Sequence, residues 1–432
     1  MERIEPLLFK EYPNLKENVP WIPLLTNVPT PVERLTKLEK YFNLEDGQIY
    51  IKRDDKNHQI YGGNKLRKLE FIFGNTIKRK KKKAIVTCGG IGTNHGLACL
   101  IACNILKPSL KCDLFLFNQP LTWHVQRSLL LYDYFGAKLH FGKRDVSTLI
   151  KALFFWIFHR KYDFILPGGS PLIGRGTPLG IVGFIEAILE LNEQIKKGQI
   201  SEPDIIFIAA GTTGTAAGLI AGCKLLGLKT KVYAVAVVKD FIVNSSNLAR
   251  NASKALKYLH KKDKNFPKLK VTEDDFELIK GYLGSGYGVK TIRGQKAVDT
   301  IFELEGKEKG FDLETTYTGK AMAGMFDFLI KEENKNKIIL FWNTYNSNDL
   351  DNYIKETQFD YKKLPKKFHK FFEETNFQCW QITNCSDDIK MDCPAYLNHE
   401  YRFWRIIECQ LDEDSKNKAY EELNNVIKLE DA

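Results

Sequence analysis

Short apolar runs rich in β-branched residues alternate with longer amphipathic stretches along most of the chain, and Gly or Pro marks each switch. This alternation predicts an α/β protein with a mainly parallel sheet, because parallel strands are joined by helical crossovers. Most of the runs are continuously apolar, which is typical of strands covered by helices on both faces. The expected strands span 49–53, 84–88, 111–117, 205–210, 231–236 and 337–342.

Length and composition bound the class of protein. A chain of 432 residues predicts two or three domains with enough apolar surface for stability without disulfides. The nine cysteines are odd in number and five lie in apolar segments, so we expect free thiols in a reducing cytosol. The N-terminus carries charges and prolines throughout, and the longest apolar run (153–158) is far shorter than the ~20 residues of a membrane helix. We therefore expect a cytoplasmic protein without a membrane span.

The net charge of +11 raises the question of nucleic acid. The most basic run, residues 78–83, has no interleaved aromatic residues, so it is expected to be a solvated helix end or loop. A nucleic-acid partner is therefore not predicted.

A lysine follows the first of three Gly-containing turns. Gly62 and Gly63 free the backbone after the first strand, and a helix is expected to start with Asn64 as its cap and Lys65 in its first turn. The positive end of the helix dipole promotes the neutral amine of a partly buried lysine there, as an imine-forming lysine requires. The alternative is that Lys65 is one more solvated lysine.

The second turn is rich in hydrogen-bond donors. Thr93, Asn94 and His95 follow Gly90 and Gly92 at the expected start of a helix, a good site for a carboxylate. A dinucleotide site is disfavoured because the spacing G-x-G-x-x-x-G misses the G-x-G-x-x-G register and no acidic residue ends a strand at the expected offset.

The third turn follows the most apolar strand. Gly211, Thr212, Thr213, Gly214 and Thr215 supply backbone N–H and hydroxyl donors at a helix start, which suits a dianionic phosphate. No lysine follows the second glycine, so this is not a nucleotide-binding P-loop. The structural alternative is a turn that lets helices pack closely.

An imine-forming lysine, a carboxylate-binding turn and a phosphate-binding turn together indicate pyridoxal 5'-phosphate acting on a small-molecule amino-acid substrate. At these positions the chain resembles the D-cysteine desulfhydrase and 1-aminocyclopropane-1-carboxylate deaminase family, from about Leu25 to about Trp342. The segments that carry the resemblance are 51–55, 62–70, 93–95, 167–169 with 178–180, 211–219 and 317–322.

This resemblance implies a fold and an assembly. The expected fold is the two-domain α/β arrangement of tryptophan synthase β-like enzymes (fold type II of pyridoxal phosphate enzymes), with mainly parallel sheets. The larger, cofactor-binding domain would hold residues 1–69 and 179–362, the smaller domain residues 70–178, and residues 363–432 would form a C-terminal extension of unknown role. A homodimer is implied as well.

The resemblance also implies roles for single residues. Lys65 would bind the cofactor covalently and move the α-proton, and Asn94 would hydrogen-bond the cofactor's phenolic oxygen. Residues 211–215 would hold the phosphate, where Thr213 replaces a usual glycine and would be strained at positive φ. Asn64 and residues 93–95 would bind the substrate, and Tyr287 and Tyr317 would face it.

Two threonines favour one chemistry within that family. The deaminase branch carries Glu after the second tyrosine and Leu in the late strand motif, whereas desulfhydrase-like members carry Thr at both, as Thr318 and Thr344 do here. A hydroxyl near the pyridine nitrogen cannot hold a proton there as an ion pair, so the ring is a weaker electron sink. We therefore predict β-elimination from D-cysteine to pyruvate, ammonia and hydrogen sulfide. The alternative is a cyclopropane-acid deaminase or a related D-amino-acid deaminase.

Two departures keep further alternatives open. Asn343-Thr344-Tyr345-Asn346 stands where relatives have His-Thr-Gly-Gly, which allows another substrate or an inactive member that acts as a binding protein. In the extension, Cys379, Cys385, Cys393, His399 and Cys409 lack the paired C-x₂-C spacing of a zinc site, so no metal is expected. Its aromatic residues are expected to pack on the enzyme or on a partner chain.

Overall fold

The computed structural model describes residues 5–79, 82–106, 108–119, 121, 123–171, 176–356 and 360–373. The chain divides into two compact units, one of residues 1–82 and 165–348 and one of residues 83–164 and 349–432. The cysteines and the histidine weighed above as zinc ligands lie outside the described residues.

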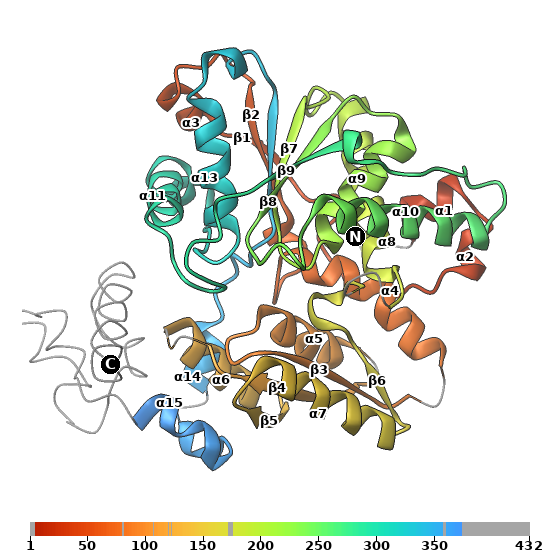
Figure 1. Ribbon diagram of the computed structural model, residues 1–432, viewed down its shortest axis with the longest axis vertical. Helices are drawn as coiled ribbons and strands as arrows, with labels where there is room; N and C mark the ends of the chain where they lie inside the picture. The colour runs from red at the N-terminus through yellow and green to blue at the C-terminus, as the bar shows by residue number, and fades with distance from the viewer. Residues whose placement is uncertain are drawn as a thin grey trace, which may run out of the picture. The chain divides into compact units, whose positions relative to one another are not determined.

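The first unit is built on a six-stranded sheet with the order β1-β2-β10-β7-β8-β9 (Figure 1). Its neighbouring strands are parallel, except that β1 is antiparallel to β2. The expected strands at 49–53, 205–210 and 231–236 are confirmed, and the last expected strand begins two residues later than predicted. The strands are β1 (Val32–Arg34), β2 (Ile49–Arg53), β7 (Ile205–Ala210), β8 (Lys231–Ala236), β9 (Phe276–Ile279) and β10 (Ile339–Asn343).

Helices cover both faces of this sheet, which explains why its central strands are apolar throughout. Helices α8, α9 and α10 pack on one face, and α3, α11 and α13 pack on the other. The helices of the first unit are α1 (Leu7–Glu11), α2 (Leu15–Asn18), α3 (Thr36–Tyr41), α4 (Asn64–Lys78), α8 (Leu179–Lys196), α9 (Gly214–Leu226), α10 (Ser245–Lys262), α11 (Ile292–Ile301), α12 (Lys307–Lys309) and α13 (Thr318–Leu329).

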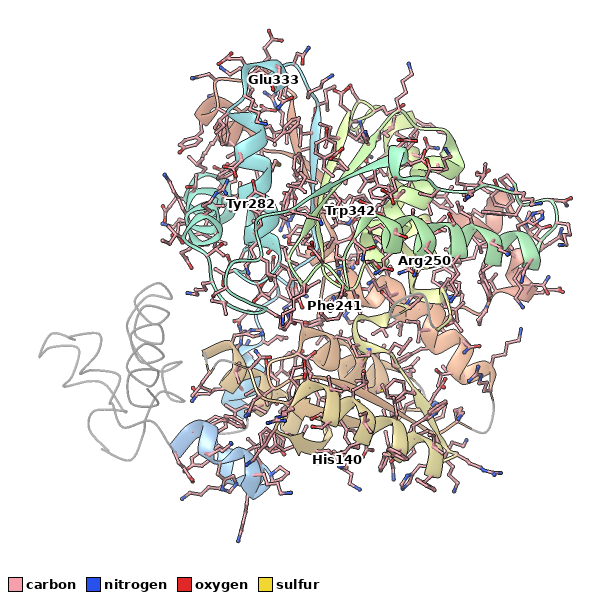
Figure 2. The ribbon with its side chains drawn as sticks, viewed as in Figure 1. His140, Phe241, Arg250, Tyr282, Glu333 and Trp342 are labelled. Atoms are coloured by element: carbon pink, nitrogen blue, oxygen red, sulfur yellow. The ribbon has the colours of Figure 1, made fainter. Side chains whose placement is uncertain are left out.

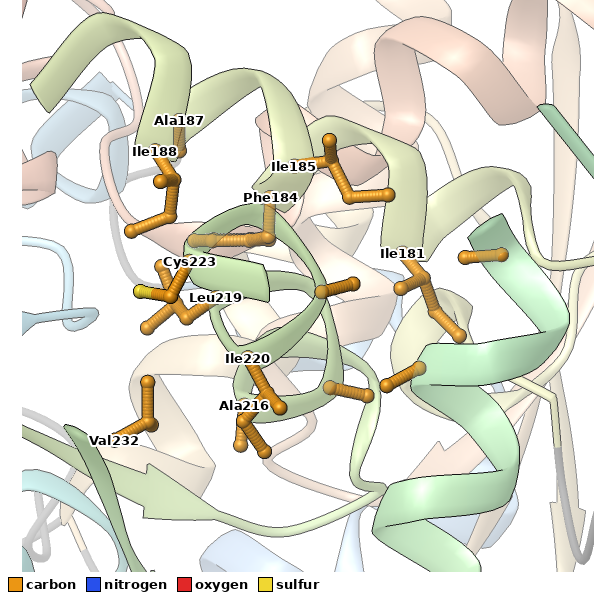
Figure 3. Packing of buried hydrophobic residues seen from close by; sticks show 14 of the residues in the cluster. Ile181, Phe184, Ile185, Ala187, Ile188, Ala216, Leu219, Ile220, Cys223 and Val232 are labelled. Atoms are coloured by element: carbon orange, nitrogen blue, oxygen red, sulfur yellow. The ribbon is translucent and has the colours of Figure 1, made fainter. Parts of the chain in front are cut away.

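Glycines on α9 let it approach α8 closely (Figure 3). A Cβ added at Gly218 would lie 2.3 Å from the Cβ of Phe184, and one at Gly222 would lie 2.6 Å from the Cβ of Ile188. Real Cβ atoms do not approach so closely, so larger residues would push the helices apart. Close helix packing, the structural alternative for the third turn, therefore explains Gly218. The turn before Gly218 still has the hydrogen-bond donors of residues 211–215.

The second unit has a four-stranded parallel sheet in the order β5-β4-β3-β6. The expected strand 111–117 is confirmed, and the one expected at 84–88 extends to Gly90. Among the described residues of either unit, no helix is long and apolar enough to cross a bilayer. The elements of this unit are β3 (Ala84–Gly90), β4 (Lys111–Phe117), β5 (Lys138–Gly142), β6 (Tyr162–Phe164), α5 (Asn94–Ile105), α6 (Trp123–Tyr134), α7 (Asp145–Phe158), α14 (Asp351–Glu356) and α15 (Lys370–Glu373).

A buried ionic network joins α4 to the sheet of the first unit. The side chain of Arg67 contacts Asp54 at 2.7 Å and Glu190 at 3.0 Å, and Lys52 contacts Glu190 at 2.7 Å. Trp342, labelled in Figure 2, donates its Nε1–H to Asp54 at 2.8 Å. The motif at residues 51–55 thus orients α4, which carries Lys65, and does so with charges that are at most 5% exposed.

We expect Glu190→Gln to lower the free energy of unfolding by about 3–5 kcal/mol, because it leaves Arg67 and Lys52 buried with less opposing charge. Burial raises the pKa of Glu190, but the two cations outweigh burial and hold that pKa below its usual value. The contribution is therefore present above pH about 4.5 and is lost as the pH falls further.

Urea denaturation at pH 7 checks this prediction. Glu193→Gln on the same helix is the matched control, since Glu193 pairs with Lys196 at an exposed position and should change stability by less than about 1 kcal/mol. Equal effects of the two variants would contradict the assigned role of the network.

Candidate active site

Lys65 lies in the first turn of α4, as the sequence predicts. The helix begins one residue earlier than expected, because Gly63 (φ +96°) is the N-cap and Asn64 is the first helical residue. Asn64 is therefore not the cap. Its side chain instead accepts a hydrogen bond from Lys65 Nζ at 2.7 Å and donates one to Thr215 Oγ1 at 3.1 Å. Asn64 thereby connects the lysine to the third turn.

The third turn precedes the N-terminus of α9. Thr213, its N-cap, has φ +64°, which costs a β-branched residue about 1–3 kcal/mol. The Thr213 hydroxyl accepts a hydrogen bond from Asn251 at 2.7 Å, which holds the strained residue in place. The first N–H groups of α9 have no partner within the helix, so this turn presents donors to a ligand.

A second lysine, which the sequence reasoning missed, lies beside this turn. Lys68 is buried and donates to the Gly168 carbonyl and to Ser170 Oγ, both at 3.0 Å. A Cβ added at Gly214 would lie 3.3 Å from Lys68 Nζ and 1.9 Å from Ser170 Oγ. Burial and the charge of Lys65 lower the pKa of Lys68 well below 10.5. Its position three residues after Lys65, on the same helix face, was the available sequence signal.

The two predicted tyrosines lie together. The hydroxyls of Tyr287 and Tyr317 share a hydrogen bond, and the rings meet edge to face with centroids 6.0 Å apart. A Cβ added at Gly211 would lie 3.1 Å from the Tyr317 ring, so Tyr317 packs on the start of the third turn. Burial and the Tyr287 hydroxyl raise the pKa of Tyr317 well above 10. This phenol is therefore protonated at neutral pH.

Thr318 is buried at the start of α13 and is turned toward Glu314. Its hydroxyl accepts from the Glu314 N–H at 2.9 Å. The Glu314 carboxylate in turn accepts the backbone N–H groups of Thr316, Tyr317 and Thr318 at 2.7–2.9 Å. Glu314, a second residue that the sequence reasoning missed, thus holds Tyr317 by its backbone.

The altered late motif is part of the same region. The Thr344 carbonyl accepts the Asn64 N–H at 3.2 Å, and the Asn346 side-chain oxygen accepts the Gly62 N–H at 2.7 Å. A Cβ at Gly63 would lie 2.6 Å from the Thr344 oxygen, so only glycine fits there. The motif that departs from the family therefore supports the turn before Lys65.

The remaining predicted residues belong to the second unit. Thr93 is the N-cap of α5 and accepts the Gly96 N–H at 3.3 Å, while Asn94 begins the helix. His95 is buried, with its ring 3.6 Å from Cys99 Sγ one turn later. The predicted site residues are thus divided between the two units. The second unit holds Thr93–His95. The first unit holds Asn64, Lys65, Gly211–Thr215, Tyr287, Tyr317, Thr318 and Thr344.

The second turn has a pH-sensitive neighbour. His124 Nε2 donates to the Gly92 carbonyl at 3.1 Å, and burial together with Arg127 lowers the pKa of His124 to about 4. An unfolded histidine binds its proton at pH about 6.5, so the unfolded chain binds more protons between pH 6.5 and 4. Stability should therefore fall as the pH decreases through this window, by up to about 1.4 kcal/mol per pH unit.

Urea denaturation of wild type and His124→Gln at pH 7, 6 and 5 tests this expectation. The variant keeps a side-chain donor for Gly92 but cannot titrate, so its stability should fall less steeply than that of the wild type. Parallel pH dependences for the two proteins would show that His124 does not titrate in this way.

The donors of the first unit fit a phosphate monoester. A helix N-terminus, the hydroxyls of Thr212 and Thr215, and the buried amine of Lys68 are groups that bind a dianion. With Lys65 connected to the same turn through Asn64, the residues present suit a phosphorylated carbonyl cofactor.

A family model described as pyridoxal-phosphate dependent enzyme matches residues 24–344 of the chain. The chain belongs to this family of pyridoxal-phosphate dependent enzymes, and its cofactor is pyridoxal 5'-phosphate. The match includes each of the three turns and both tyrosines.

Solved structures share the fold of this chain. An ACC deaminase homologue is 25% identical, covers 79% of this chain and 95% of its own, and superposes with a TM-score of 0.63. Threonine deaminase isoform 2 from Solanum lycopersicum is 17% identical over 82% of this chain and 88% of its own, with a TM-score of 0.52. Maize serine racemase is 13% identical over 76% and 91%, with a TM-score of 0.50. The fold is therefore the expected α/β fold of type II pyridoxal phosphate enzymes.

Proposed function

We propose that this enzyme is a lyase that converts D-cysteine to pyruvate, ammonia and hydrogen sulfide. The reaction breaks the Cα–H and Cβ–S bonds and consumes one water molecule in releasing ammonia from the remaining three-carbon fragment. When bound, pyridoxal phosphate supplies the electron sink that makes the α-proton of an amino acid acidic. The protein must then move a proton at Cα and supply one to sulfur.

Lys65 is the proposed base at Cα. The hydrogen bond to Asn64 Oδ1 points its amine in one direction, and Lys68, whose pKa is lowered by burial and by the charge of Lys65, lies three residues later on the same helix. The start of α4 adds the positive end of a helix dipole. The helix dipole disfavours a positive charge at this place, and the neutral amine is the form that can accept a proton.

Tyr287 and Tyr317 are the proposed donors to the leaving sulfur. A phenol whose pKa is raised, as that of Tyr317 is, remains protonated and gives a hydrogen bond more readily than it accepts a proton. In their shared hydrogen bond one hydroxyl donates its proton to the other, and the accepting hydroxyl can donate its own proton to the ligand. The pair is therefore better suited to donating a hydrogen bond to the leaving thiolate than to abstracting the α-proton.

The observation that carries the choice of reaction is the polar environment at Thr318. This position holds a hydroxyl that is bonded to Glu314 in place of a carboxylate, and the Glu314 carboxylate is itself occupied by three backbone N–H groups. A site without a free carboxylate beside the ring nitrogen favours the easier chemistry, expulsion of a β-thiol. Opening a cyclopropane needs a stronger electron sink.

The test is an assay of the cofactor-loaded protein with D-cysteine, L-cysteine, D-serine and 1-aminocyclopropane-1-carboxylate. We expect sulfide and pyruvate in equal amounts from D-cysteine, and slower or no product from the others. Formation of 2-oxobutyrate from the cyclopropane acid, without sulfide from D-cysteine, would reverse the assignment. The similarity to the ACC deaminase homologue makes that reaction the second candidate.

A cytoplasmic location and a homodimer form part of the same proposal. Among the described residues, five cysteines are free and buried, namely Cys88, Cys99, Cys103, Cys112 and Cys223. Burial raises the pKa of Cys88 and of Cys223 to about 12, so these thiols are unreactive. This is consistent with a reducing compartment.

A further inference from the structure

One side of helix α7 is apolar and exposed, and no described residue of the second unit packs on it. Val146, Ile150, Phe154, Ile157 and Phe158 each have between 46% and 77% of their side chain exposed. Their spacing of three, four and seven residues places them on one side of the helix. We call these five residues the α7 face.

The opposite side of α7 is already used for packing. Leu149, Ala152, Phe155 and Trp156 pack on the buried residues of the sheet that include Val86 and Phe115. Helix α7 therefore packs on the sheet through its inner side, and the α7 face takes no part in that contact. Isolated exposed apolar residues are ordinary, but five along one helix form a continuous patch that indicates a binding surface.

The charges on α7 and directly before and after it in the chain are almost all positive. Lys143 and Arg144 precede the helix, Lys151 lies in its middle, and Arg160 and Lys161 follow it, all exposed. Asp145 is the one exposed acidic residue between positions 143 and 161. A complementary partner would thus combine apolar side chains with negative charge.

A cavity of about 460 Å³ extends the patch toward the C-terminal part of the chain. Phe115, Phe141 and Lys151 line one side of it, and Pro365–Phe368 line the other. Phe154 follows Lys151 by three residues, so the cavity adjoins the α7 face. The Phe141 ring packs edge to face on Phe368 and Phe371, 5.5 and 5.6 Å between centroids, and His140 beside it is labelled in Figure 2.

The described chain ends at Glu373, five residues after Phe368 of the cavity lining, and 59 residues follow. Residues 374–432 contain 13 acidic and 6 basic side chains, a net charge of −7, whereas the rest of the chain is +18. The segment also supplies apolar side chains, namely Phe377, Trp380, Tyr396, Phe403, Trp404, Ile406 and Ile407. It has both properties that the α7 face requires of a partner.

We propose that residues 374–432 fold back on the second unit and cover the α7 face. The contact is intramolecular and gains from a high effective concentration, because residues 365–368 of the same chain line the adjoining cavity. The α7 helix is about 21 Å long, so a segment of this length can reach all of it. The role of the extension is then to complete the surface of the second unit, and this inference is independent of the reaction catalysed.

Hydrogen exchange of the full-length, cofactor-loaded protein tests the proposal. We compare the wild type with the double variant Phe154→Glu/Phe158→Glu, which adds negative charge to an already exposed surface. Ile292→Glu, on the 90% exposed side chain in α11 of the first unit, is the matched control. The expected result is that peptides from 374–432 are protected in the wild type and in the control, and exchange at least tenfold faster in the double variant.

Four results would overturn the proposal. Peptides from 374–432 that exchange at the rate of an unstructured chain in the wild type would show that the segment is not docked. Protection that the double variant leaves unchanged would place the segment elsewhere. Protection that disappears on dilution, together with dissociation in sedimentation velocity, would assign the face to a second copy of the chain. If the wild type and the control cosediment with phosphatidylserine–phosphatidylcholine vesicles and the double variant does not, the α7 face would be assigned to a lipid surface.

Discussion

Lys65→Ala is expected to lower kcat by at least about 10³-fold and to remove the absorbance band that the bound cofactor gives in the wild type. The variant loses both the covalent attachment point and the proposed base, each of which contributes by orders of magnitude. Folding should be unaffected, because Asn64 keeps its bond to Thr215 and Arg67 keeps the ionic network.

The near-ultraviolet and visible spectra, recorded before and after D-cysteine is added, check this prediction together with the thermal unfolding midpoint. Lys78→Ala is the matched control, since Lys78 lies at the exposed end of the same helix. A wild-type band that shifts with D-cysteine while sulfide forms would support the proposed reaction. An unaltered band and full activity in Lys65→Ala would remove this lysine from the site.

Lys68→Met is expected to weaken cofactor binding by about 10- to 100-fold. A hydrogen bond to a charged group contributes about 1.5–3 kcal/mol, and every 1.4 kcal/mol is a tenfold change in affinity. Lys68 Nζ lies at Gly214, where the donors of the third turn converge, so its charge would act on the phosphate. The methionine fills a similar volume and removes only the charge and the donors.

Titration of the cofactor-free protein with pyridoxal phosphate, followed by absorbance, measures this change. Lys78→Met serves as the control for the same substitution on the same helix. In the cofactor-free protein the pKa of Lys68 is lowered, so its burial destabilises the folded state below pH about 10.5. The variant should therefore lose affinity without losing stability. Equal affinity in the variant and the wild type would show that Lys68 does not face the phosphate.

The strands could be predicted almost residue by residue. Those at 49–53, 111–117, 205–210 and 231–236 have the expected bounds, because helices cover both faces of each sheet and leave an uninterrupted apolar run in the sequence. The start of α4 was wrong by one residue, since Gly63 at positive φ takes the cap position expected for Asn64. A cap depends on local backbone geometry, which composition indicates only approximately.

Part of the candidate site could not be predicted in this way. Lys68 was overlooked because a lysine in a basic chain is usually solvated, and only the packing of residues 168–170 against Gly214 buries it. Glu314 was overlooked because its carboxylate acts on the backbone of the turn that follows it. Its functional consequence, the position of Tyr317, depends on the fold of that turn.

By itself the sequence determined the α/β class, the order of the strands along the chain and the three turns that end them, because these depend on local patterns of apolar residues and glycines. The tertiary structure decided the order of strands within each sheet and the grouping of Lys65, Lys68, residues 211–215 and the two tyrosines in one unit. It also decided which charges are buried, since burial arises from contacts between segments more than one hundred residues apart, as between Arg67 and Glu190. Such contacts leave no local pattern in the chain.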